Sequence, residues 1–97
     1  MENAKKIVYR WIENWDGGDA SGYFNSPEEA KADAETHVKE IRWTANEFKS
    51  MIKMWGQDGS CFVLIERIYL DEDGDEIGFD DDVDAVLVNE STVDRVY

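Results

Sequence analysis

Two signals for the start of a helix lie in the middle of the chain, and they limit its possible folds more than any other feature. Ser26, Pro27 and Glu29 stand in the order of an N-cap residue, a first helical residue and a capping-box acid. Thr44 and Glu47 form a second capping box. The sequence therefore predicts two separate helices that begin close to these residues.

Apolar residues follow each start at helical spacing. They occupy positions 30, 34, 38 and 41 after the first start, and positions 48, 51, 52 and 55 after the second. This spacing predicts one helix over residues 27–41 and another over Ala45–Trp55, which Gly56 would end. A strand over residues 51–55 is the alternative for the second segment, but its support is shorter than that of the helix.

The segments on either side of the helices have the alternation of strands. Residues 5–15 and Cys61–Leu70 are rich in β-branched and aromatic side chains, and Asp73-Gly74 is a preferred hairpin pair. Short extended pieces over 76–79 and 83–88 can complete a sheet. We therefore predict an α+β fold: a small antiparallel sheet of three or four strands, with the two helices inserted after the first strand and packed on one face (β-α-α-β-β-β).

The central strand has apolar residues on both of its predicted faces. One face carries Phe62, Leu64, Ile68 and Leu70, and the other carries Val63, Ile65 and Tyr69. Helices on one side leave the other face to the C-terminal tail, a second copy of the chain or a partner. A charged residue in place of Val63 or Ile65 is expected to disrupt such a dimer.

Length and composition indicate one folded domain over residues 1–97. The hydrophobic share is 42% and the chain has four Trp, which exceeds what disordered chains carry. No apolar run approaches the roughly 20 residues that span a bilayer, and the N-terminal residues lack the apolar core of a signal peptide. The single Cys61 fits a reducing compartment. We expect a cytoplasmic location.

The charge is strongly acidic and unevenly distributed. The chain has 23 acidic and 10 basic residues, for a net charge of −13. The C-terminal third, residues 71–97, holds 11 acids and 1 base, a net charge of −10; residues 1–70 hold 12 acids and 9 bases, a net charge of −3. Such a field repels nucleic acids and anionic membranes, and it attracts cations or basic protein surfaces.

The acidic run over residues 70–84 does not match a calcium loop of the EF-hand type. When Gly74 takes the sixth position of that loop, Asp71 and Asp73 fit, but Tyr69 takes the first position, Glu76 the apolar eighth and Asp80 the twelfth. A frame that starts at Asp71 places Gly74 at the fourth position. Weak binding of Ca²⁺ or Mg²⁺ remains open, but we expect no dedicated metal site and no cofactor.

No catalytic constellation is present in the sequence. His37 lies on the first predicted helix without a Cys, Ser or second His to form a site with it, and Cys61 opens an apolar strand. We interpret both as structural residues and expect the protein not to be an enzyme. Most of the four Trp are expected in the core, with Trp15, beside a glycine-rich loop, the most exposed.

The segments "YFNSPEEAKADAE" and "RWTANE", followed by a hairpin with Gly and Asp, resemble small proteins encoded by bacteriophages and prophages. In size and acidity the chain is similar to phage-encoded anti-CRISPR and other anti-defence inhibitors, several of which imitate DNA. The resemblance implies a protein inhibitor that acts inside a bacterial host, and it assigns no role to individual residues.

Charge mimicry is the function that the acidic third favours. Extended chain rises about 3.3 Å per residue, close to the 3.4 Å per phosphate along one DNA strand. Carboxylates on extended chain would therefore occupy a basic nucleic-acid-binding groove of a partner, with Phe79 as an apolar anchor. The predicted partner-binding residues are Asp71, Glu72, Asp73, Asp75, Glu76, Phe79, Asp80, Asp81, Asp82 and Asp84. The alternative is a dimeric structural module in which the acids serve only solubility.

Overall fold

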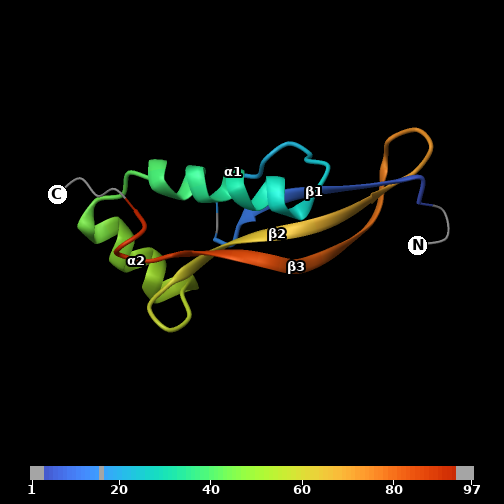
Figure 1. Ribbon diagram of the computed structural model, residues 1–97. Helices are drawn as coiled ribbons and strands as arrows, with labels where there is room; N and C mark the ends of the chain where they lie inside the picture. The colour runs from blue at the N-terminus through green and yellow to red at the C-terminus, as the bar shows by residue number, and fades with distance from the viewer. Residues whose placement is uncertain (1–3, 16, 94–97) are drawn as a thin grey trace.

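β2 (Cys61–Leu70) is the middle strand of a three-stranded antiparallel sheet with the order β1-β2-β3 (Figure 1). The computed structural model describes residues 4–15 and 17–93. Along the chain the elements are β1 (Lys6–Glu13), α1 (Pro27–Glu40), α2 (Ala45–Trp55), β2 and β3 (Glu76–Val88). The predicted α+β fold, with both helices inserted after the first strand, is confirmed.

Both helices begin where the capping signals predict. The Ser26 hydroxyl accepts a hydrogen bond of 3.2 Å from the Glu29 backbone N–H, and the Thr44 hydroxyl accepts one of the same length from Glu47. The Glu47 carboxylate accepts in return from the Thr44 backbone N–H, which completes the capping box of α2. These bonds satisfy N–H groups that the first turn of a helix leaves without intrahelical partners.

The two extended pieces predicted after the hairpin turn form one strand, β3, with an irregularity near its middle. Ile65 pairs with Asp84 and Arg67 pairs with Asp80, so three β3 residues, 81–83, lie opposite the single residue Glu66. Extra residues of this kind form a β-bulge, which bends the strand and increases its local twist. The run of three Asp therefore lies at a bulge on an edge strand, where sequence alone suggested a break between strands.

At Ile65 and Glu66, opposite the bulge, the buried side chains of β2 switch from one face of the sheet to the other. From Cys61 to Ile65 the odd-numbered side chains are buried, and from Glu66 to Leu70 the even-numbered ones are. The prediction of one covered and one open face along the whole strand is therefore wrong. Val63 and Ile65 belong to the main core, so they cannot form the open face on which a dimer was expected. The half-buried Phe62 and Leu64 lie on that face instead.

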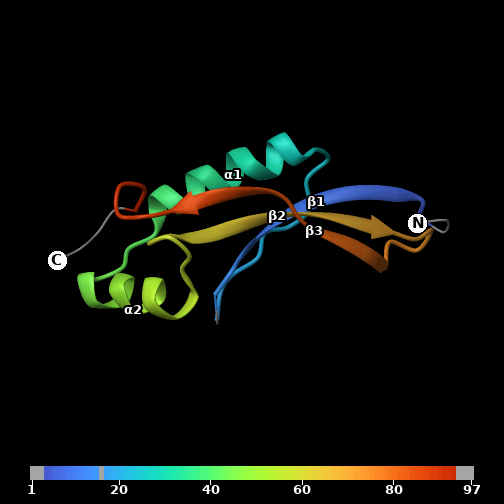
Figure 2. The same cartoon turned by 90° about the horizontal axis from the view of Figure 1, so that it is seen from below.

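The core has two parts on opposite faces of the sheet. The larger part lies beneath α1, where Ala30, Ala34 and Val38 pack against Trp11, Val63 and Ile65. α2 contributes Phe48, Met51 and Ile52 from a place beside the start of β2, beyond the last residue pair of β1 and β2 (Figure 2). The smaller part consists of Val8, Ile68 and Leu70.

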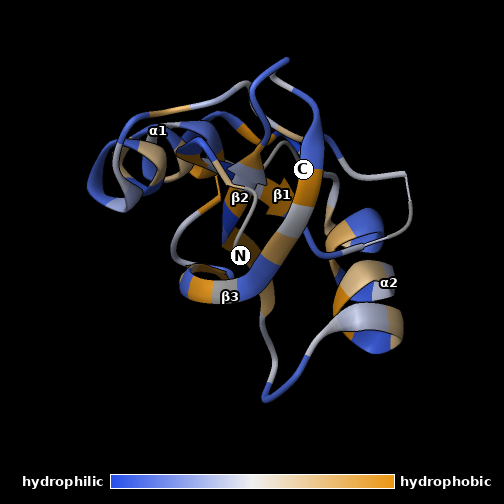
Figure 3. Ribbon diagram, turned by 90° about the vertical axis from the view of Figure 1, so that its right-hand side faces the viewer, coloured by the Kyte–Doolittle hydropathy of each residue, from blue (hydrophilic) through white to orange (hydrophobic). Residues whose placement is uncertain are grey.

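The molecule is elongated, with principal extents of 48 × 22 × 19 Å. The helices lie toward one end, and the turn between β2 and β3 forms the other (Figure 1). The view along the long axis places the hydrophobic strands β1 and β2 between α1 and α2 (Figure 3).

After β3 the chain turns at Asn89 and buries Val93 in the main core; the rest of the predicted tail, 94–97, lies outside the described residues. Among the described residues, no helix has the length and apolar character needed to cross a membrane.

Candidate acidic interface

The turn between β2 and β3 gathers five of the ten predicted partner-binding residues at one end of the molecule. It is a closed turn rather than an extended chain, because the Asp71 carboxylate accepts hydrogen bonds of 2.9 Å from the backbone N–H groups of both Asp73 and Asp75. Gly74 has a φ of +85°, which a residue with a side chain rarely adopts. The expected phosphate-like spacing of Asp71, Asp73 and Asp75 along extended chain is therefore wrong.

This turn brings three carboxylates together. One oxygen each of Asp71, Asp73 and Asp75 lies within 4.8 Å of the others. Oxygen ligands at such separations suit a hard cation such as Ca²⁺. However, one Asp71 oxygen already closes the turn, and exposed carboxylates gather on many acidic surfaces.

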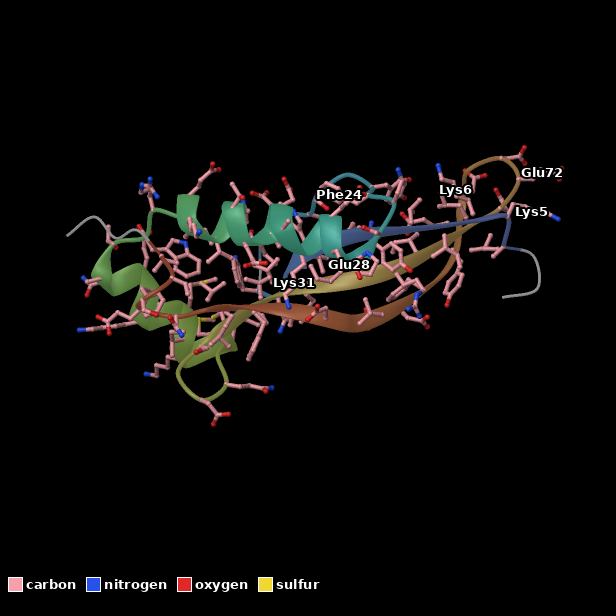
Figure 4. The ribbon with its side chains drawn as sticks, viewed as in Figure 1. Lys5, Lys6, Phe24, Glu28, Lys31 and Glu72 are labelled. Atoms are coloured by element: carbon pink, nitrogen blue, oxygen red, sulfur yellow. The ribbon has the colours of Figure 1, made fainter. Side chains whose placement is uncertain are left out.

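Three acids at the turn have no intramolecular partner for their side chains among the described residues: Glu72, Asp73 and Asp75 are exposed and take part in no described hydrogen bond or ion pair through their carboxylates. Lys5 and Lys6 lie at the same end of the molecule, where β1 begins, and reduce its charge only in part (Figure 4). The field of these three carboxylates is therefore directed into solvent, where a cationic surface can meet it.

Glu76 differs from them because two side chains from distant parts of the sequence bind it. The Tyr23 hydroxyl donates a hydrogen bond of 2.5 Å to its carboxylate, and the Arg10 guanidinium lies 3.4 Å from the same oxygen. The bond to Glu76 is the main reason that the pKa of the Tyr23 hydroxyl is raised. Glu76 thus ties β3 to β1 and to the loop before α1.

Asp80 and Asp84 are also held within the molecule. The Tyr69 hydroxyl donates a 2.5 Å bond to Asp80, and Arg67 lies 3.4 Å from it; these contacts, the Tyr69 bond first, lower the pKa of Asp80. Asp84 accepts a bond of 2.8 Å from the Ala85 backbone N–H and lies 3.2 Å from Lys31 of α1. The Ala85 bond is the first cause of the lowered pKa of Asp84. Both carboxylates stabilise the sheet locally.

Asp81 lies at the bulge and makes a contact that sequence analysis missed. Its carboxyl group lies close enough to that of Glu66, a residue that is only 5% exposed, to raise the pKa of Glu66. Arg10 donates a bond of 2.8 Å to the same Glu66 side chain. Burial, and after it the neighbouring Asp81 carboxyl group, raises the pKa of Glu66, although the bond to Arg10 opposes this. In the sequence, the one signal for the pair of Glu66 and Asp81 is that Glu66 occupies a position of the β2 alternation where apolar residues are expected.

The stability of the fold is therefore expected to depend on the ionisation of Glu66. The pKa of Glu66 is higher in the folded state than in the unfolded state, where it is about 4.3. The contribution of Glu66 to the free energy of unfolding is therefore full below the pKa of the unfolded state, and it is lost as pH rises through the pKa of the folded state. The melting temperature of the protein should thus fall relative to that of Glu66→Gln between acidic and neutral pH. Calorimetric melting of both proteins across this range measures the difference. The exposed substitution Glu35→Gln serves as the control for the loss of one surface charge. A melting temperature that rises relative to that of Glu66→Gln would show that the Arg10 ion pair dominates.

The remaining two predicted partner-binding residues are Phe79 and Asp82, which both lie on β3. Phe79 pairs with Ile68 on β2 and is 56% exposed, so its ring is accessible as an apolar contact. Asp82 belongs to β3, but its side chain lies outside the described part of the structure. The hairpin therefore carries all ten predicted residues on one continuous segment, although the described carboxylates divide into exposed ones and internally bonded ones.

The structural interpretations of His37 and Cys61 fit their surroundings. His37 lies 2.7 Å from the Glu13 carboxylate and stacks on Trp11 with ring centroids 4.2 Å apart. Cys61 is buried, and burial raises the pKa of its thiol, which disfavours the reactive thiolate. The expectation that Trp15 is the most exposed Trp is wrong, because Trp15 packs edge-on against Trp43 while Trp55 is 40% exposed.

Comparison of the chain with protein-family models, with curated proteins and with solved structures found no match in any of the three.

Proposed function

We propose that this protein is a non-enzymatic inhibitor that binds a basic nucleic-acid-binding surface of another protein through the acidic end of its β2–β3 hairpin. One observation carries the proposal: Glu72, Asp73 and Asp75 are exposed at the end of an elongated molecule, with no described intramolecular partner for their carboxylates. A net charge of −13 adds a long-range attraction for basic surfaces.

Carboxylates without internal partners suit this role because no internal ion pair has to break when they bind a cationic surface. A partner that normally binds DNA would exchange phosphates for carboxylates and keep a large part of its electrostatic attraction. The proposed mimicry depends on the density of charge at the turn rather than on a regular row of phosphate-like groups. Glu76, Asp80 and Asp84, which have internal partners, maintain the shape of the hairpin.

The class of target that we propose is a DNA-handling or defence protein in the cytoplasm of a bacterial host. A nucleic-acid-binding groove offers the clustered Lys and Arg that an acidic surface requires, and phage-encoded inhibitors of host defence meet such grooves in infected cells. The exposed Phe79 of β3, the strand that follows the turn, adds apolar contact area beside the charges.

Competition with DNA tests this proposal directly. The immobilised protein is exposed to a nuclease-treated bacterial lysate, and bound proteins are eluted either with short duplex DNA or with a neutral polymer at the same ionic strength. We expect nucleic-acid-binding proteins that duplex DNA releases and the neutral polymer does not. Proteins that resist both DNA and about 1 M salt, which screens charges beyond roughly 3 Å, would overturn the proposal.

The second candidate is a dimeric module, and the open part of the sheet favours it. Ile12, Phe62 and Leu64 are half-buried on the face away from α1, and Leu87, paired with Phe62, is 42% exposed. In this case the bulge and the acids of β3 would protect an edge strand from uncontrolled pairing, which is a common use of charged residues at sheet edges.

A further inference from the structure

A groove of about 570 Å³ lies between α1 and the loop that precedes it. Tyr23, Phe24 and Asn25 line it from the loop, and Glu29, Asp33 and Thr36 from α1. Its lining thus combines two aromatic rings with two carboxylates. Figure 4 shows Phe24 on this loop, close to the start of α1.

The groups that line the groove are held in place by contacts on its far side. Phe24 pairs with Tyr9 through two backbone hydrogen bonds of 2.9 and 2.7 Å, so its loop is fixed to the edge of β1. Asp33 accepts a bond of 2.7 Å from the Trp11 indole through one oxygen. Glu29 accepts a bond of 3.1 Å from the Asn25 backbone N–H, also through one oxygen. Each carboxylate therefore keeps a second oxygen for another donor.

In the part of the chain that the structure describes, the lining of the groove carries two acids and no base. No Lys or Arg belongs to its lining among the described residues, whereas the neighbouring groove along α1 contains Lys31 and Arg67 beside Glu28 and Asp84. Two carboxylates and an aromatic ring without a base favour a cation. Among protein side chains, arginine fits best, because its planar guanidinium donates to two carboxylates and stacks on a ring at the same time.

We propose that this groove binds an arginine side chain presented by the basic surface of the partner. The inference rests on the proposed function for its source of arginine. Tyr23 connects the two sites: it lines the groove and is 48% exposed, and its hydroxyl donates to Glu76 at the base of the hairpin. One partner surface can therefore contact the hairpin with its cationic groove and place one arginine beside Tyr23.

Titration with a short peptide, followed by NMR, tests the groove without the partner. The probe is a blocked Gly-Arg-Gly peptide, with lysine and citrulline peptides for comparison. We expect the backbone signals of residues 23–25 and of the first turns of α1 to shift, with affinity about threefold weaker for lysine and lost for citrulline. Citrulline keeps the shape of arginine without its charge.

Isosteric variants locate the binding. Glu29→Gln with Asp33→Asn keeps both acceptor bonds of these side chains, so the fold is retained, and it should weaken arginine binding about tenfold. The matched hairpin variant Glu72→Gln with Asp73→Asn should bind the peptide like the natural protein. Shifts confined to the hairpin, equal affinity for all three peptides, or full binding by the groove variant would each overturn the inference. Because this titration needs no partner and the DNA competition needs no groove, a failure of arginine binding at the groove can be distinguished from a failure of the proposed function.

Discussion

Reversal of two charges at the hairpin turn, Glu72→Lys with Asp73→Lys, is expected to weaken partner binding on the order of 100-fold at low salt. Both side chains are exposed and without described partners, so their loss should leave the melting temperature close to that of the natural protein. Asp80 is a poorer choice for reversal, because a lysine there would face Arg67. Surface plasmon resonance against a partner isolated by DNA elution measures the change.

A charge reversal on another part of the molecule distinguishes the effect of the hairpin charges from the effect of the net charge. Glu35→Lys with Glu40→Lys changes the net charge by the same amount on the exposed side of α1, far from the hairpin turn (Figure 1). If the hairpin is the interface, this control should lose only the small, salt-sensitive share of binding that comes from the overall field. Equal losses for the two variants would show that total charge, and not the hairpin, determines binding.

The second large effect is expected in the main core. Ile65→Ala should lower the free energy of unfolding by about 3–4 kcal/mol, since it removes a fully buried side chain beneath α1 and leaves a cavity. Its neighbour Leu64 points to the opposite face and is only half-buried, so Leu64→Ala should cost about 1 kcal/mol. Urea denaturation of both variants measures the two costs.

Light scattering on the same proteins tests the dimeric alternative. A monomer should give one mass for the natural protein and for Leu64→Ala. If the natural protein is instead a dimer that Leu64→Ala converts to monomers, the open face is an interface between copies and the second candidate gains support. The costs of Ile65→Ala and Leu64→Ala would then be similar, because both side chains would be buried in the assembly.

The parts of the fold that follow from short sequence segments were predicted well. α2 and β2 have the predicted bounds, and α1 ends one residue earlier than expected, because the capping boxes and the alternation of residues act within a few positions. The change of buried side on β2 could not be predicted. It depends on the bulge in β3, where Asp80 and Asp84 pair with Arg67 and Ile65, and no local pattern fixes this long-range register.

The candidate site shows the same limit. Composition located the acidic segment, but it could not separate the acids that face solvent from those that bind internally. For Glu76 and Asp84 that separation depends on Arg10, Tyr23 and Lys31, each more than fifty residues from its carboxylate partner. For Asp80 it depends on Arg67 and Tyr69 of the neighbouring strand. The side chains that neutralise an acidic run are therefore invisible in the run itself.

The change of buried side at Ile65 and Glu66 also separates the evolutionary constraints on the two ends of the molecule. Toward the helices, substitutions must satisfy a core shared by both helices and all three strands. Beyond the bulge, the buried apolar cluster that the structure describes is limited to Val8, Ile68 and Leu70, and a glycine and a closing aspartate shape the turn. Under the proposed function, new recognition sequences could be exchanged at the hairpin without rebuilding the scaffold, much as antibody loops vary on a constant framework.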